Sequence, residues 1–136
     1  MRILGIDYGR KKCGVAVTDP LQLIATGLMT VPTHQLLDWL TDYLDREEVS
    51  DLVVGESLTE DRSANPIQKE IVGFERKVAK RFPELRLHRQ DEFLSSRRAR
   101  ESMLAMGMKK KRRRDKSEVD RIAATLILQD FLEERN

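Results

Sequence analysis

The order of apolar and polar positions predicts short strands at the start of the chain and helices later. Apolar runs over residues 2–7 and 13–18 flank the polar stretch 8–11 and are typical of two strands joined by a turn. Residues 22–31 predict a third strand. Because such short connections suit antiparallel neighbours, these strands are expected to form a meander.

Helical spacing begins after the meander. Thr33 is expected to cap a helix that ends before Asp51 and carries apolar residues at i, i+3 and i+4, namely Leu36, Leu37, Leu40, Tyr43 and Leu44. The rest of the pattern predicts, in order, a strand over 51–55, a helix over 66–81, a strand from 85 to 87, a helix over 94–106 and a last helix over 117–133. A meander followed by alternating strands and helices implies a mixed sheet, since the later strands return parallel through right-handed crossovers.

Composition agrees with a single α/β domain over residues 1–136. Apolar residues make up 40% and charged residues 35% of the chain, which is typical of a folded protein with a polar surface. The one cysteine, Cys13, can form no internal disulfide and is expected to pack as a small buried side chain. His34 and His88 are expected to be ordinary surface or strand residues. With no apolar stretch near the ~20 residues needed to span a bilayer, we expect a cytoplasmic protein.

Charge is distributed unevenly, although the net charge is only +2. Residues 109–116 hold seven bases and one acid, within an expected mobile loop over about 107–116. Such a run could be only a solvated surface, or it could bind the phosphates of a nucleic acid without reading its bases. The candidate phosphate-binding residues are Arg10, Lys11, Lys109, Lys110, Lys111, Arg112, Arg113 and Arg114.

Acidic residues stand at the expected strand ends and in the last helix. Asp7 ends the first strand, Asp91 and Glu92 follow the last strand, and Asp120 lies early in the last helix. Carboxylates that converge at one sheet edge would suit Mg²⁺ or Mn²⁺, and two such ions support phosphodiester cleavage. Glu56, directly after the strand 51–55, is an additional candidate.

Each acid also has a structural explanation. Asp7 could accept a backbone hydrogen bond in the turn before Gly9. Asp120 could complete a capping arrangement with Ser117 at the N-cap. Glu56, Asp91 and Glu92 could be loop acids, and the spacing alone does not choose between the two explanations.

The resemblance to a known family rests on four stretches, LGIDYGRKKCGVAVTD, DLVVG, QDEFLSS and VDRIAATLILQ. They resemble successive motifs of the YqgF (RuvX) family, Holliday-junction resolvase-like nucleases implicated in maturing the 5′ end of pre-16S ribosomal RNA. The resemblance implies a ribonuclease H-like fold with five strands in the order 3-2-1-4-5. It also implies a metal-binding acidic core formed by Asp7, Glu92 and Asp120.

Two departures from the family pattern concern substrate handling. Phe93 stands where the family usually has an arginine after the D-E pair, and Glu56-Ser57 replace the usual Leu-Pro after the glycine of the fourth strand. Glu56 and Asp91 therefore remain additional candidate acids.

The main hypothesis is a Mg²⁺- or Mn²⁺-dependent nuclease that acts on pre-rRNA, with a Holliday-junction DNA endonuclease as the alternative. A second hypothesis is a nucleic-acid-binding or ribosome-binding factor without turnover. A third follows from D-x-G in the first stretch, which also resembles a phosphate loop of actin-like ATPases and sugar kinases, although 136 residues cannot supply their two domains. The sequence leaves open whether the protein is a monomer or a homodimer.

Overall fold

The first apolar run forms the central strand of a five-stranded sheet. The structure is a computed structural model that describes residues 1–56, 66–91 and 116–135, with the backbone alone for Glu56, Pro66, Asp91 and residues 116–120. The sheet order is β3-β2-β1-β4-β5, which confirms the expected order. The strands are β1 (Arg2–Tyr8), β2 (Lys12–Thr18), β3 (Ala25–Pro32), β4 (Val49–Glu56) and β5 (Arg86–Asp91).

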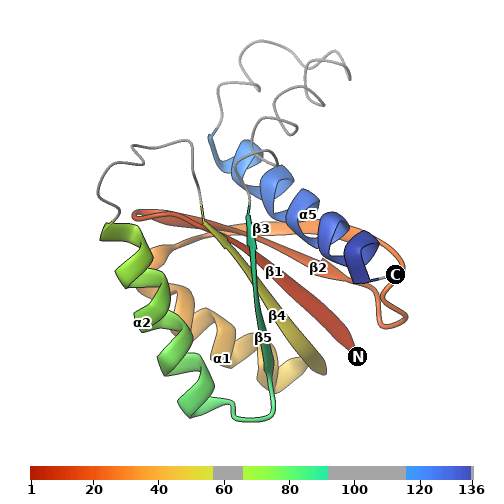
Figure 1. Cartoon of the computed structure of the whole chain (residues 1–136), viewed down its shortest axis with the longest axis horizontal. Helices are drawn as coiled ribbons and strands as arrows, with labels where there is room; N and C mark the ends of the chain where they lie inside the picture. The colour runs from red at the N-terminus through yellow and green to blue at the C-terminus, as the bar shows by residue number, and fades with distance from the viewer. Residues whose placement is uncertain (57–65, 92–115, 136) are drawn as a thin grey trace.

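Strand direction changes at β1. On one side β1 pairs antiparallel with β2, and β2 pairs antiparallel with β3. On the other side β1, β4 and β5 run parallel. The carboxyl ends of these three parallel strands therefore meet at one edge of the sheet (Figure 1).

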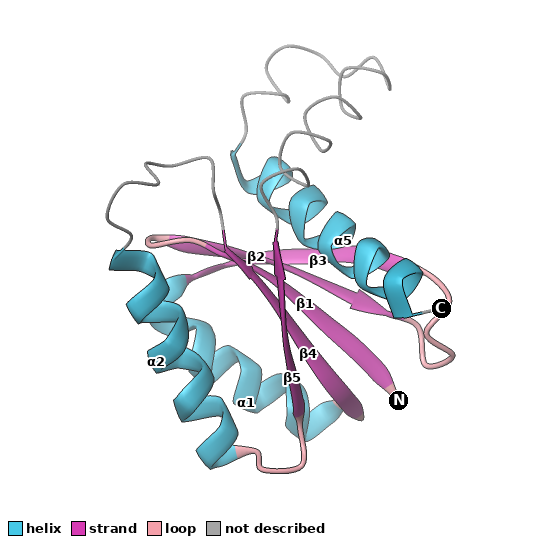
Figure 2. Ribbon diagram, viewed as in Figure 1, coloured by secondary structure: helices cyan, strands magenta, loops and turns pink. Residues whose placement is uncertain are grey.

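Helices cover both faces of the sheet (Figure 2). The short helix η1 (Thr33–Gln35) leads into α1 (Leu36–Arg46), which shares one face with α2 (Pro66–Arg81), while α5 (Lys116–Arg135) crosses the other face. No helix in the described part of the chain is long and apolar enough to cross a membrane.

The period-two alternation of β1 divides the core into two clusters. Leu4 and Ile6 pack with α1 and α2, whereas Ile3 packs with α5 residues that include Ala124 and Leu128. The odd positions of β1 therefore face α5. Gly5 lies so close to this helix that a Cβ built there would be 2.5 Å from Leu128 Cγ.

Most of the predicted elements are confirmed, and the helix over 66–81 has the predicted bounds. Three local predictions were wrong. Residues 22–24 form a loop, since β3 begins at Ala25. Thr33 does not cap a helix, because Pro32 is the N-cap of η1 and makes no side-chain hydrogen bond there. Ser117 lies within α5, which removes it from the N-cap position. The predicted helix over 94–106 and the basic run lie outside the described residues.

Candidate active site at the carboxyl ends of the parallel strands

Asp7 is a buried carboxylate at the edge where the parallel strands end. It is the penultimate residue of β1, and only 5% of its surface is exposed. Within the described ranges, Asp7 and Thr18 are the two buried polar residues. The Thr18 hydroxyl accepts a hydrogen bond from the Ile3 amide at 2.9 Å, so its burial is explained by the fold. Asp7, an ionisable carboxylate at the edge where the parallel strands end, is the functional candidate of the two.

Two glycines flank Asp7 in the sheet. Asp7 is in register with Gly14 on β2 and with Gly55 on β4. Neither glycine places a side chain beside Asp7 in the sheet. Carboxylate oxygens are the ligands that Mg²⁺ and Mn²⁺ prefer, so this buried carboxylate fits a divalent cation. Only the strand register brings Gly14 and Gly55 beside Asp7.

The turn after β1 is tight and presents two bases. A Cβ on Gly9 would be 2.5 Å from the Lys12 carbonyl oxygen, so the turn requires glycine at this position. Arg10 and Lys11 follow and are exposed. Both bases are thus in the turn that directly follows the strand of Asp7.

Thr33 ties this turn to the start of η1. Its hydroxyl donates to the Gly9 carbonyl oxygen at 2.7 Å, and its amide donates to the Lys11 carbonyl oxygen at 2.9 Å. Cys13 is fully buried, as predicted, with its Sγ 3.4 Å from Thr33 Oγ1. We refer to Gly9, Lys11, Cys13 and Thr33 as the turn clamp. Sequence reasoning missed it, because a threonine after a strand is equally typical of a helix cap.

Tyr8 supports the turn from the opposite face of the sheet. Its ring lies 5.6 Å from that of Phe74, and burial, together with the nearby Cys13 and Glu70, raises the pKa of Tyr8 to about 12. At neutral pH its hydroxyl therefore keeps its proton. Tyr8 therefore packs beneath the turn as an uncharged ring.

The other candidate acids lie at different backbone positions relative to Asp7. Glu56 is in register with Tyr8, one position beyond the row that contains Asp7, and Asp91 is in register with Glu56. Asp120 precedes Ala124 by one helical turn, and the Ala124 carbonyl oxygen would be 3.2 Å from a Cβ on Gly5. Glu92 and the bases 109–114 lie outside the described residues. Among side chains that the structure describes, no three His, Cys, Asp or Glu residues are grouped closely enough to hold a metal ion.

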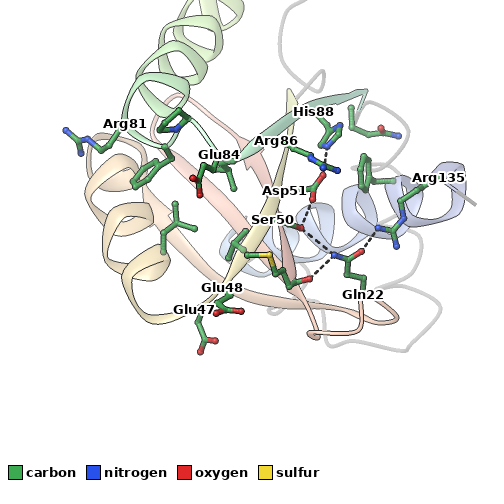
Figure 3. Close-up of a pocket in the computed structure, with 18 of the residues that line it drawn as sticks. Gln22, Glu47, Glu48, Ser50, Asp51, Arg81, Glu84, Arg86, His88 and Arg135 are labelled. Atoms are coloured by element: carbon green, nitrogen blue, oxygen red, sulfur yellow. Dashed lines mark hydrogen bonds and ion pairs between the residues drawn. The ribbon is translucent and has the colours of Figure 1, made fainter.

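A hollow of about 1550 Å³ lies at the end of β4 and β5 opposite to Asp7 (Figure 3). There His88 Nε2 lies 2.7 Å from Asp51 Oδ2, and Ser50 donates to the other carboxylate oxygen. Burial alone would raise the pKa of Asp51, but the hydrogen bonds from Ser50 and His88 outweigh burial and lower it. His88 is a strand residue, as expected, and its contact with Asp51 was not predicted.

Comparison with known proteins identifies the chain's relatives. The sequence pattern of the RuvX family, described as Holliday junction resolvase, matches residues 1–134. A protein of Bacteroides thetaiotaomicron named "Putative pre-16S rRNA nuclease" is 47% identical over 134 residues, which cover 98% of this chain and 97% of the relative. A protein of Christiangramia forsetii with the same name is 47% identical over 133 residues, 98% of each chain.

Solved structures share the fold at much lower identity. Thermus thermophilus RuvC in complex with a Holliday junction substrate has a TM-score of 0.60 at 16% identity, and the match covers 99% of this chain and 95% of RuvC. The Holliday junction resolvase of fowlpox virus has a TM-score of 0.57 at 14% identity and covers 98% of this chain. These likenesses confirm the ribonuclease H-like fold.

Proposed function

Because the chain belongs to the RuvX family, we propose that it is a metal-dependent nuclease that processes the 5′ end of pre-16S rRNA. The observation that carries this proposal is Asp7, a buried carboxylate between two glycines at the carboxyl ends of the parallel strands. The names of the full-length relatives support rRNA as the substrate. This substrate would place the protein in the cytoplasm.

The metal would be held by Asp7, Glu92 and Asp120, and it would be Mg²⁺ or Mn²⁺. When bound, such ions activate water and stabilise the leaving oxygen of a phosphodiester. Asp7 contributes a carboxylate fixed by the central strand, so it requires little rearrangement to bind a cation.

The alternation of β5 supports Glu92 over Asp91 as a ligand. His88 contacts Phe131 of α5 and Gln90 donates to Glu134 of α5, whereas Arg89 pairs with Glu75 of α2. Even positions of β5 thus share the α5 face with Asp7, whereas Asp91, the last residue of the strand, is at an odd position.

The geometry of α5 supports Asp120 as the third ligand. Ala124 packs against Gly5. Asp120 comes one helical turn before Ala124 on α5, and Asp7 comes two residues after Gly5 on the same face of β1. One helical turn and two strand residues each span about 5–7 Å. With the N-cap role of Ser117 contradicted, metal binding is the better explanation for an acid at this position.

The bases beside the site would hold the substrate. Arg10 and Lys11 extend from the clamped turn next to Asp7, and they would bind phosphates adjacent to the scissile bond. The bases 109–114 would add sequence-independent affinity that falls as salt rises. We assign no catalytic role to Glu56 and Asp91. Both are in register with Tyr8, which lies on the opposite face of the sheet from Asp7.

The test is cleavage of pre-16S rRNA, single-stranded RNA and four-way junction DNA side by side, with Mg²⁺ and with a chelator. We expect cleavage at the 5′ end of the 16S sequence only with the metal. Metal-independent binding without cleavage of any substrate would overturn the proposal in favour of a non-catalytic binding factor.

A second candidate function is cleavage of branched DNA. It is favoured by the family description and by the fold shared with RuvC bound to its junction. Faster metal-dependent cleavage of the four-way junction than of pre-rRNA would establish this function instead.

A further inference from the structure

Five large apolar residues are exposed along one edge of the molecule. Leu21, Leu23 and Ile24, in the connection between β2 and β3, are 76%, 71% and 67% exposed. Leu28 and Met29, on β3, are exposed as well. We refer to these five residues as the apolar strip. Three of the five stand within four residues of one loop and the other two are adjacent on β3, so the strip is a candidate interaction surface.

Polar contacts hold the loop that carries the first three of these residues. The Asp19 carboxylate accepts hydrogen bonds from the amides of Leu21, Leu23 and Ile24 at 3.2, 2.8 and 2.8 Å. These hydrogen bonds lower the pKa of Asp19, and the bond from the Ile24 amide has the largest effect. The carboxylate therefore stays charged at neutral pH. The loop is therefore ordered even though its largest side chains point into solvent.

Gln22 anchors the same loop to the body of the protein. It has a φ of 60°, an uncommon backbone conformation for a residue other than glycine. Its side chain donates to the Met1 carbonyl oxygen at 2.8 Å and accepts from Arg135 (Figure 3). A preorganised loop loses little entropy on binding, which favours association through the residues that it presents.

The strip continues along an edge strand. β3 is the last strand of the sheet on its side, with β2 as its neighbour. Val15 pairs with Met29 and Ala16 pairs with Gly27, so Leu28 is the extra residue of a bulge. Natural edge strands are usually protected by charged residues, but β3 contains none.

The absence of charge narrows the choice of partner. Residues 20–37 contain no Asp, Glu, Lys or Arg, in a chain that is 35% charged. A nucleic acid or an anionic membrane would require bases at its contact surface. A second copy requires none, and the carboxylate of Asp19 just before this stretch is already held by the amides of its own loop.

The exposed area suits a weak pair. From their exposed fractions the five residues present roughly 500 Å² per copy, so two facing strips would bury at most about 1,000 Å², the size of weak, transient interfaces. We propose that two copies associate through the apolar strip, with a two-fold axis that places each β2–β3 loop and β3 edge against its counterpart.

The proposal is tested by measuring molecular mass as a function of protein concentration. Sedimentation of the wild type from about 1 to 100 μM is expected to show a monomer–dimer equilibrium, as an interface of this size allows. Ile24→Lys is expected to raise the dissociation constant at least about tenfold by placing a charge in each strip. Val72→Lys is the matched control, because Val72 is exposed on α2, away from the strip, and should leave the equilibrium unchanged.

A cross-link gives a second, independent readout. Leu23→Cys is expected to form a disulfide between copies under mild oxidation, whereas the wild-type Cys13 is buried and should not. A wild type that stays monomeric over the whole range would overturn the proposal. So would a dimer that Ile24→Lys and Val72→Lys weaken equally. A monomer that gains mass only with neutral lipid vesicles would show that the strip binds lipid instead.

Discussion

Gly5→Ala tests the packing that places α5 against the central strand. An added Cβ would be 2.5 Å from Leu128 Cγ, 3.0 Å from Leu128 Cδ2 and 3.2 Å from the Ala124 carbonyl oxygen. Leu128 is fully buried, so it moves only by displacing its packed neighbours. Overpacking of this kind costs about 1–3 kcal/mol of unfolding free energy.

The companion change Leu128→Ala opens a cavity at the same contact. Alone it is expected to cost about 2–5 kcal/mol, as is usual for a buried leucine. In the double variant the new Gly5→Ala methyl group occupies part of that cavity. The double variant should therefore be more stable than the sum of the two single changes predicts, by about 1 kcal/mol or more.

Urea denaturation followed by far-UV circular dichroism measures all three free energies. Gly73→Ala is the matched control, since a Cβ at this helical position meets nothing within 4 Å and should stabilise the protein by about 0.5–1 kcal/mol. If Gly5→Ala were as harmless as Gly73→Ala, or if the two single costs were simply additive, the packing described for α5 would be wrong.

Two further predictions concern the turn clamp and the contact between Asp51 and His88. Thr33→Val removes the hydroxyl that donates to the Gly9 carbonyl oxygen and should cost about 1 kcal/mol in urea denaturation. It should also raise KM for the proposed substrate more than it lowers kcat, and an unchanged KM would contradict the clamp's role. Asp51→Asn should destabilise the protein at pH 7. Folding lowers the pKa of Asp51, so the charged carboxylate stabilises the folded protein at pH values above its ordinary pKa of about 3.9. This stabilisation is lost as the pH falls through the pKa that Asp51 has in the folded protein. The difference from wild type should thus narrow below about pH 4, and a constant difference would refute the pairing with His88.

The sequence predicted best those elements whose own residues determine them. The bounds of α2 followed from Pro66, Pro83 and the apolar spacing between them, and the structure has the same bounds. The start of β3 was misplaced, because Leu23 and Ile24 are as apolar as strand residues. Their amides bond to the Asp19 carboxylate instead of to β2, and periodicity does not report that competition.

In the candidate site, too, the local feature was predictable and the contacts between strands were not. Asp7 was predictable, because an acid at the end of an apolar strand is a local signal. The glycines on both sides of it belong to two other strands, so only the register shows that they flank the carboxylate. The partnership of Asp51 with His88 likewise joins two strands and leaves no pattern in either one.

The central claim is that Asp7 is the metal-binding centre of a nuclease. The most direct measurement is Mg²⁺-dependent cleavage of pre-16S rRNA by the wild type, by Asp7→Asn and by Asp42→Asn, which changes an exposed acid on α1 as the control. We expect Asp7→Asn to lower kcat by at least about 10²–10³-fold with an unchanged circular dichroism spectrum, and Asp42→Asn to match the wild type. Cleavage by a folded Asp7→Asn variant at the wild-type rate would contradict the account.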